Sequence, residues 1–265
     1  PKPDIRLNRK QHTRVGLLQI QRVIDTLNDN DVTEVVLAGA LKKPKIWDII
    51  PDKVGKELLK QAHTRHDDEL LKLALKKLKS EGFKITSAQE IDSDLLTPTG
   101  NLTKKTPNVR QQKDIQLGRN AAIKLGEADI GQAVIVQNHT VLGVEGVEGT
   151  DNLIVRCAPL RGKSKGGILV KMAKPNQTEL ADLPTIGVNT IKQLKKHKYA
   201  GVAVEAGRSI CLERDKVLKA AKRAGVFVVG ILPEQISNPS NQPLLEEQEE
   251  QPTQTAVTDE PKQAY

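Results

Sequence analysis

The residues whose types and spacing point most clearly to chemistry lie in the segment 166–187, which reads GGILVKMAKPNQTELADLPTIG. Apolar residues recur at helical spacing after Thr185, so we expect a helix there with Thr185 as its N-cap. Asp182 would then precede a helix start, where free N–H groups and the helix dipole favour anions or a metal-bound phosphate. A carboxylate there can hold a cation or orient a water molecule beside a phosphate. The alternative is that Asp182 is only a second capping side chain.

A second acidic pair, Asp67 and Asp68, lies beside His63 and His66 at the start of a leucine-rich amphipathic pattern. The helix dipole also favours carboxylates in a first turn, so capping alone is one interpretation. The other is a site for Mg²⁺, which prefers oxygen ligands and keeps bound waters. Zinc is disfavoured because no second cluster of His or Cys accompanies the two histidines.

Arg208 follows a strand-like run at 199–205 and a glycine. An arginine at a tight turn can donate two parallel hydrogen bonds to one phosphate, and an ordinary surface arginine is the alternative.

Two other segments are rejected as nucleotide sites. Residues 143–151 lack the G-x-G-x-x-G order, and the Gly-Lys-Ser at 162–164 follows Cys157 where a phosphate loop needs glycine.

The composition describes a folded, basic protein with an aliphatic core. Of its 265 residues, 37% are hydrophobic and 28% charged, whereas aromatic residues make up only 2%. The net charge of +8 favours an anionic partner, although a merely soluble basic surface is also common. Cys157 and Cys211 lie in apolar surroundings, which predicts buried, reduced thiols of an intracellular protein. Neither a signal peptide nor a membrane-spanning segment is evident.

The pattern of strands and helices predicts an α/β protein with two domains and a tail. We assign 1–107 to an N-terminal α/β domain, with a linker rich in Pro, Gly, Thr and Lys at 95–108. The C-terminal domain covers 108–234, and the Gln-, Glu- and Pro-rich residues 235–265 predict a disordered tail. The elements expected in the C-terminal domain are helices at 112–125 and 214–224, a hairpin at 133–144, and strands at 168–170, 199–205 and 226–231.

A series of segments in one order carries a resemblance to a known family. The segments are VVLAG at 35–39, HDDELL and KSEGF within 66–83, DIGQAVIV at 129–136, VEGTDNLI at 147–154, KPNQTELADLPTIG at 174–187, VAVEAGR at 202–208 and GVFVVGI at 225–231. Together they resemble the UDP-2,3-diacylglucosamine pyrophosphatases of lipid A biosynthesis, the LpxI family. The match covers nearly the whole chain except its two ends, and such an ordered series is far more specific than one motif.

The resemblance implies two α/β lobes, a Rossmann-like N-terminal domain and a distinct C-terminal domain, with the site between them. It implies a metal-dependent hydrolase that cleaves the diphosphate of UDP-2,3-diacylglucosamine to UMP and 2,3-diacylglucosamine 1-phosphate, known as lipid X. The family's essential carboxylate maps onto Asp182, and its paired acids map onto Asp67 and Asp68; these three would hold Mg²⁺ or Mn²⁺. The matching segments supply the expected substrate-binding residues, which are Glu148, Thr150, Asp151, Lys174, Thr185, Gly187 and Arg208.

The chain departs from the family pattern in its first part. Family members begin with a strand and a glycine-rich loop of the form GLIAGGG, which would precede Pro1, so we expect the N-terminal domain to be incomplete at its start. Ala40 stands in place of a common asparagine, and His66 in place of a glycine. A catalytically weakened relative is therefore one alternative. A basic RNA- or anion-binding module without enzymatic activity is another, disfavoured by the few aromatic residues and the lack of a nucleic-acid motif.

The expected surroundings follow from the acylated substrate. We expect a cytoplasmic protein that associates transiently with the cytoplasmic face of the inner membrane, where basic side chains are attracted to anionic lipids. No nucleic-acid partner is expected, and a homo-oligomer is left open.

Overall fold

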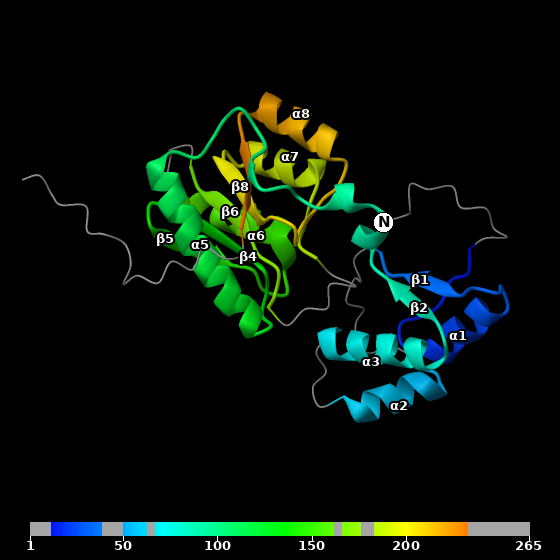
Figure 1. Cartoon of the computed structure of the whole chain (residues 1–265). Coiled ribbons are helices and arrows are strands. Elements are labelled where there is room, and N and C mark those ends of the chain that lie inside the picture. Colours follow the sequence, from blue (N-terminus) through cyan, green and yellow to red (C-terminus); the bar gives the residue numbers. More distant parts are fainter. Residues whose placement is uncertain (1–11, 39–49, 63–66, 162–165, 176–182, 233–265) are drawn as a thin grey trace, which may run out of the picture. The chain divides into compact units, whose positions relative to one another are not determined.

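The computed structural model describes residues 12–38, 50–62, 67–161, 166–175 and 183–232, and at 67 and 68 it describes the backbone alone. Within these residues the chain is a mixed α/β protein whose largest sheet has six strands (Figure 1). The predicted fold class is therefore confirmed.

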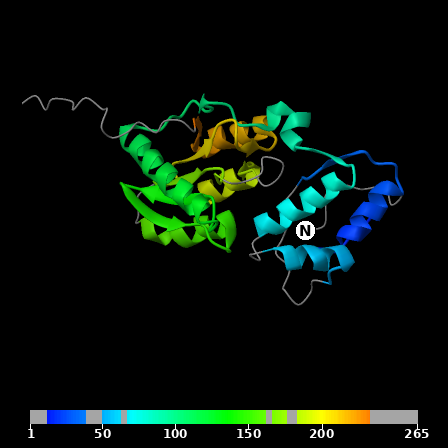
Figure 2. The ribbon, with the colours of Figure 1, turned by 60° about the horizontal axis from the view of Figure 1, so that its bottom comes forward.

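The N-terminal domain is built around a short parallel sheet and amphipathic helices. Its helices are α1 (Ile20–Asn28), α2 (Lys53–Gln61) and α3 (Asp67–Ser80), which Figure 2 shows in blue to cyan, and its paired strands are β1 (Glu34–Val36) and β2 (Lys84–Thr86). Leucines at helical spacing give α3 one apolar face, which packs against α1 and β2. The buried residues of this small core are Ile24, Leu75, Leu78, Phe83 and Ile85.

The segment expected to be a linker contains a strand. After α4 (Ala88–Ile91) and a short 3-10 helix (Ser93–Leu95), the chain forms β3 (Gly100–Asn101), which pairs antiparallel with the last strand of the C-terminal sheet. The Thr103 hydroxyl accepts a hydrogen bond of 3.0 Å from the backbone N–H of Val228, which extends this contact. Part of the expected linker is therefore an edge of the C-terminal sheet, because its backbone groups find partners there.

The C-terminal sheet has the strand order β3-β10-β8-β6-β4-β5. Its other strands are β4 (Ala133–Gln137), β5 (Thr140–Val144), β6 (Ile168–Lys171), β8 (Gly201–Glu205) and β10 (Phe227–Ile231). Strands β6, β8 and β10 are parallel, whereas β4 runs antiparallel to β6 and β5 antiparallel to β4. The hairpin and the three buried strands expected from sequence are thus present.

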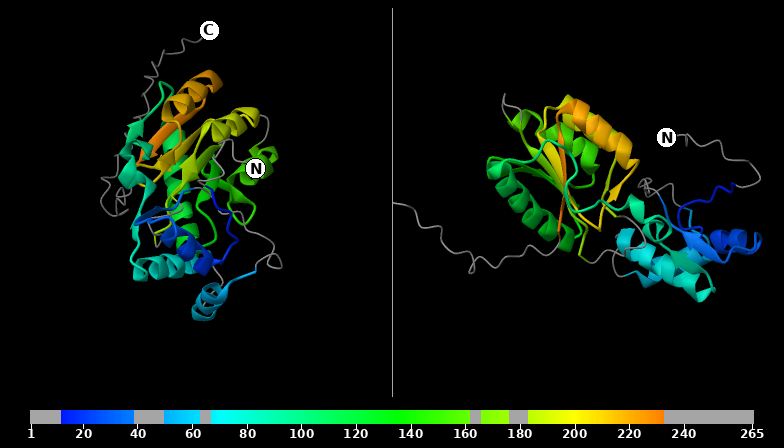
Figure 3. Two further views of the ribbon diagram at one scale, coloured as in Figure 1. Left: turned by 90° about the vertical axis from the view of Figure 1, so that its right-hand side faces the viewer. Right: turned by 45° about the horizontal axis from the view of Figure 1, so that its top comes forward.

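Helices cover both faces of this sheet (Figure 3). Helix α5 (Val109–Glu127) packs on one face, and α6 (Gly149–Cys157), α7 (Val188–Lys196) and α8 (Arg214–Ala224) pack on the other. Alternate residues of β4 serve the two layers, with Val134 and Val136 facing α5 and Ile135 facing the other helices. Gly118 lets α5 approach closely, since a Cβ there would lie 2.6 Å from Cγ2 of Val170.

The β4–β5 hairpin turns at Asn138 and His139, whose φ angles of 51° and 59° lie in the left-handed region. The buried carboxylate of Asp114 on α5 accepts the N–H of Asn138 at 3.0 Å and the N–H of His139 at 2.6 Å. One helix side chain therefore fixes the turn of the predicted hairpin.

The prediction that Thr185 is a helix N-cap is wrong. Thr185 and Ile186 form β7 (Thr185–Ile186), which pairs in parallel with β9 (Ile210–Cys211), and α7 starts only at Val188 with Gly187 as its N-cap. The reason is that a partner strand is available, and the Thr185 hydroxyl donates to the carbonyl of Leu183 at 3.0 Å. Because β7 and Gly187 separate Asp182 from the helix in the sequence, both the helix-start and the capping interpretations of Asp182 lose their basis.

Both cysteines are buried and free, as predicted. Burial raises the pKa of the Cys157 thiol and of the Cys211 thiol, because a thiolate would lose its hydration there. These thiols are core groups and have no part in the chemistry considered below.

Tyr199 links three parts of the C-terminal core. Its side chain is fully buried, its hydroxyl donates to the carbonyl of Ile154 at 2.8 Å, and the guanidinium of Arg161 lies 4.1 Å from the ring centroid. Burial raises the pKa of Tyr199 to about 12. The neutral phenol therefore contributes stability that is complete below the ordinary tyrosine pKa of about 10 and is lost as the pH rises through about 12.

We expect Tyr199→Phe to lower the free energy of unfolding by about 1–3 kcal/mol at pH 8, because the Ile154 carbonyl loses its buried donor. Between pH 10 and pH 12, roughly the window between the unfolded and folded pKa, the difference from the parent should shrink. Urea unfolding at several pH values measures both effects. Tyr265→Phe, which removes the same hydroxyl from a segment expected to lack a core, is the control. A gap that stays constant with pH would contradict the assignment.

Candidate active site

The carboxyl ends of β6, β8 and β10 meet at one edge of the C-terminal sheet, called the carboxyl edge below. Ligands of open α/β sheets bind outside such an edge. Because β4 is antiparallel to β6, with Ala133 opposite Lys171, the start of β4 and the end of β5 lie at the same edge. The substrate-binding residues expected in this domain all follow a strand that ends here: Glu148, Thr150 and Asp151 follow β5, Lys174, Thr185 and Gly187 follow β6, and Arg208 follows β8.

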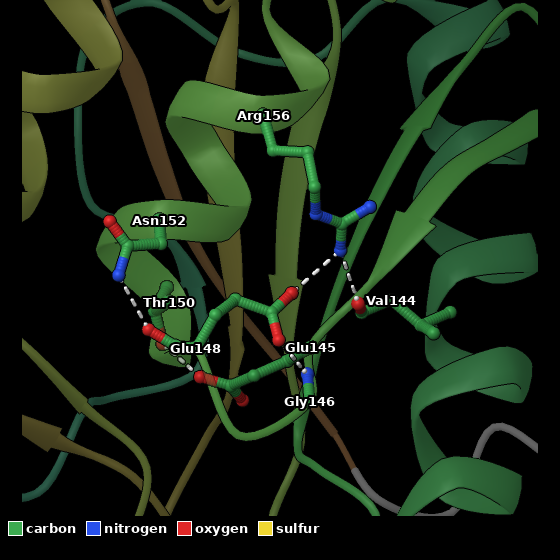
Figure 4. A network of polar contacts seen from close by, with 7 residues as sticks. All are labelled: Val144, Glu145, Gly146, Glu148, Thr150, Asn152 and Arg156. Carbon is green, nitrogen blue, oxygen red and sulfur yellow. Dashed lines mark hydrogen bonds and ion pairs between the residues drawn. The ribbon is translucent and has the colours of Figure 1, made fainter.

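A buried carboxylate that sequence reasoning missed, Glu145, organises one part of this edge. Its Oε2 accepts the N–H of Gln132 at 3.0 Å. Its Oε1 accepts the hydroxyl of Thr150 at 2.6 Å, as Figure 4 shows. The carbonyl of Gln132 in turn accepts the N–H of Met172 at 3.0 Å. Glu145 therefore connects the end of β5 with the start of β4 and the start of α6, and the Gln132 carbonyl continues this contact to Met172 after β6. The available signal was an acidic residue directly after the apolar part of a predicted hairpin.

Glu148 lies at the start of α6 in an ion pair with Arg156. Its Oε1 is 2.7 Å from Nη2 of Arg156, and its Oε2 accepts the N–H of Gly146 at 3.1 Å (Figure 4). Arg156 also donates to the carbonyl of Val144 at 2.9 Å. The hydrogen bond from Arg156 lowers the pKa of Glu148, so the pair is complete at neutral pH and is lost as the pH falls through this lowered value. Both side chains are partly exposed, so the pair adds little stability.

A hollow of about 680 Å³ lies between this ion pair and neighbouring apolar side chains. Ile130, Val144 and Val155 supply its apolar walls, and Glu148 and Arg156 supply its charged side. The three apolar residues are 57%, 39% and 46% exposed, so the carboxyl edge offers an accessible surface that is partly apolar and partly charged.

Asp151, also at the start of α6, contacts a different helix. Its Oδ2 accepts a hydrogen bond of 3.1 Å from the amide of Asn189 on α7. The two residues are exposed, so Asp151 stays accessible while it connects α6 to α7.

Two lysine side chains, at the end of β6 and just after it, make polar contacts with other segments of the chain. The buried Lys171 donates from Nζ to the carbonyl of Thr185 at 3.0 Å, and Nζ of Lys174 lies 2.5 Å from Oδ1 of Asp129. At Gly187 the backbone N–H donates to the hydroxyl of Thr190 at 3.3 Å. Of the expected substrate-binding residues after β6, Lys174 forms an ion pair with Asp129, and the backbone carbonyl of Thr185 accepts the hydrogen bond from Lys171.

Arg208 lies in the turn between β8 and β9. Its Nη1 is 3.3 Å from Oε1 of Glu205, and its side chain is 30% exposed. The pairing of β7 with β9 places Thr185 opposite Ile210. The structure therefore brings the turn that carries Arg208 beside the chain that leads into α7.

The predicted metal ligands are not tested. Asp182 lies outside the described residues, and so do the side chains of Asp67 and Asp68. Among the residues that are described, no group of three or more His, Cys, Asp and Glu side chains is arranged to hold a metal ion. Glu145 and Glu205 at the carboxyl edge are engaged with N–H and side-chain donors, so they do not fit as ligands.

We expect Thr150→Val to lower the free energy of unfolding by about 1–3 kcal/mol, because the buried carboxylate of Glu145 loses a donor while the side-chain volume at position 150 is kept. Thr150→Ser retains the hydroxyl and serves as the matched control, with a smaller effect. Urea unfolding of both variants measures the difference. Equal stability of the two variants would show that the Glu145 contact contributes nothing.

Comparisons with known proteins identify the family of this chain. Residues 2–95 match the LpxI N-terminal domain, and residues 98–229 match the LpxI C-terminal domain. The sequence is 34% identical over 241 residues to UDP-2,3-diacylglucosamine pyrophosphatase LpxI of Caulobacter vibrioides, and the match covers 88% of this chain and 86% of that protein. The resemblance inferred from the ordered segments is thus confirmed, and the chain belongs to the LpxI family.

Proposed function

We propose that this protein hydrolyses the diphosphate of UDP-2,3-diacylglucosamine to UMP and 2,3-diacylglucosamine 1-phosphate. The observation that carries the proposal is the match, over most of both chains, to a relative named for this pyrophosphatase activity. The carboxyl edge supports it, because residues from three of its strand ends supply both signs of charge and an apolar hollow. In this reaction, the oxygen of a water molecule bonds to one phosphorus of the diphosphate, and the bond from that phosphorus to the bridging oxygen breaks. The bridging oxygen stays on the other phosphate, the protons of the water pass to solvent, and each product carries one phosphate.

Arg208 is the described residue best suited to bind the diphosphate. A guanidinium presents a planar set of donors that matches phosphate oxygens, and this one is accessible beside the strand ends. Lys174 and Arg156 add positive charge near the same edge, although each already faces a carboxylate. The apolar hollow at Ile130, Val144 and Val155 is the kind of surface that acyl chains require.

We also propose that the hydrolysis requires a divalent metal ion. Asp67, Asp68 and Asp182 would hold Mg²⁺ or Mn²⁺, and a bound divalent cation would neutralise charge that develops on the diphosphate. Asp182 would also orient the attacking water. Support comes from the family's acidic segments and from the oxygen chemistry of the three side chains.

We further propose that the protein works in the cytoplasm, at the cytoplasmic face of the inner membrane. Support comes from the acylated substrate and from the net charge of +8, which attracts anionic lipid. In the described part of the chain, no helix is both long and apolar enough to cross a membrane.

We expect Asp182→Ala to lower kcat by at least about 100-fold with a smaller change in KM, because a group that acts in the transition state is lost. Release of UMP from UDP-2,3-diacylglucosamine in detergent micelles measures this. Asp94→Ala, at an aspartate that is 93% exposed, is the control and should leave kcat unchanged. A folded Asp182→Ala protein with nearly parental turnover would end the catalytic assignment.

We expect excess chelator to abolish hydrolysis and added Mg²⁺ or Mn²⁺ to restore it, since carboxylate ligands bind such cations reversibly. The same titration in Asp67→Asn and Asp68→Asn variants should require higher metal concentrations for half-maximal rate. Full activity in excess chelator would contradict metal dependence while leaving the hydrolase proposal intact.

A further inference from the structure

Glu205 is a buried charged residue at the carboxyl edge that the sequence analysis did not single out. It ends β8, and its side chain is only 3% exposed. Its Oε2 accepts the backbone N–H of Ala173 at 2.8 Å, and its Oε1 lies 3.3 Å from Nη1 of Arg208. A carboxylate is tolerated in such a place only where donors replace its lost hydration.

The two donors belong to different strand ends. Ala173 follows β6 and Arg208 follows β8, and these strands pair in parallel. The hydroxyl of Ser209 donates to the carbonyl of Glu205 at 2.6 Å, and β9 starts at the next residue, Ile210. These contacts fix the backbone on both sides of Arg208. They do not determine the direction of its long side chain.

We propose that Glu205 is a positioning residue that orients Arg208 toward the diphosphate of the substrate; this inference rests on the proposed function. An arginine side chain has many rotamers, and an ion pair to a rigid buried carboxylate selects among them. A guanidinium presents five N–H donors in a planar fork, so such a group can contact a carboxylate and a phosphate at the same time. Correct placement before the substrate binds matters because small displacements of a binding group reduce the rate strongly.

Glu205→Gln tests this contact with little change in volume. A glutamine carbonyl can still accept the N–H of Ala173, but its amide group then presents N–H donors to Arg208. The variant therefore removes the orientation of Arg208 while the anchor after β6 is kept. Glu213→Gln changes the same chemical group at a glutamate that is 59% exposed, and it is the matched control.

The first experiment measures kcat and KM for UDP-2,3-diacylglucosamine in the parent, the two Gln variants, Arg208→Ala, and the double variant Glu205→Gln/Arg208→Ala. We expect kcat/KM to fall by about 10- to 100-fold in Glu205→Gln and to stay parental in Glu213→Gln. Adding Glu205→Gln to Arg208→Ala should cause no further loss, because the two residues act as a unit. An unchanged Glu205→Gln, or a full additional loss in the double variant, would overturn the proposal.

The second experiment does not depend on hydrolysis. Side-chain ¹⁵N spectra of the parent should show a slowly exchanging Arg208 guanidinium, and Glu205→Gln should speed this exchange while the melting temperature stays close to that of the parent. Unchanged exchange would refute the orienting role, even in an active enzyme. Faster exchange in Glu205→Gln, together with a parent that does not hydrolyse the substrate, would refute the proposed function and retain only the orientation of Arg208 by Glu205.

Discussion

Buried charge at the carboxyl edge is the constraint on which the C-terminal domain depends. Glu145, Lys171 and Glu205 are each less than a tenth exposed, and each makes a hydrogen bond to a residue at least 13 positions away in the sequence. Leaving such a group without one of its partners costs roughly 1–3 kcal/mol, and more where the group is charged. The connections are therefore held in register by polar contacts, whereas the strands beneath them are held by aliphatic packing.

The topology of the sheet explains why these contacts converge. Three parallel strands end at one edge, and the antiparallel placement of β4 brings Gln132 to the same place, where it bridges Glu145 and Met172. The parallel pair β7 and β9 then joins the connection after β6 to the connection after β8. Residues far apart in the sequence are thus assembled by strand direction first and by side-chain chemistry second.

The sequence was informative where one periodicity dominates. The apolar runs of β4, β6, β8 and β10 and the amphipathic pattern of α8 predicted those elements well. Thr185 was misassigned because threonine suits both a helix N-cap and a strand, and a two-residue strand has no period to reveal it. Glu205 was missed because its burial depends on Ala173, a donor supplied by a distant part of the chain. Partners of that kind become visible only in three dimensions.

The pairing of charges at this edge also bears on how a diphosphate can be bound. Arg208, Lys174 and Arg156 each face a carboxylate, from Glu205, Asp129 and Glu148 respectively. These cations are oriented before a ligand arrives, which favours catalysis, but much of their charge is already balanced. A diphosphate concentrates negative charge on neighbouring phosphates, so preoriented arginine and lysine alone would neutralise it incompletely. An additional cation held by acidic residues outside this set, as proposed for Asp67, Asp68 and Asp182, would supply the missing positive charge.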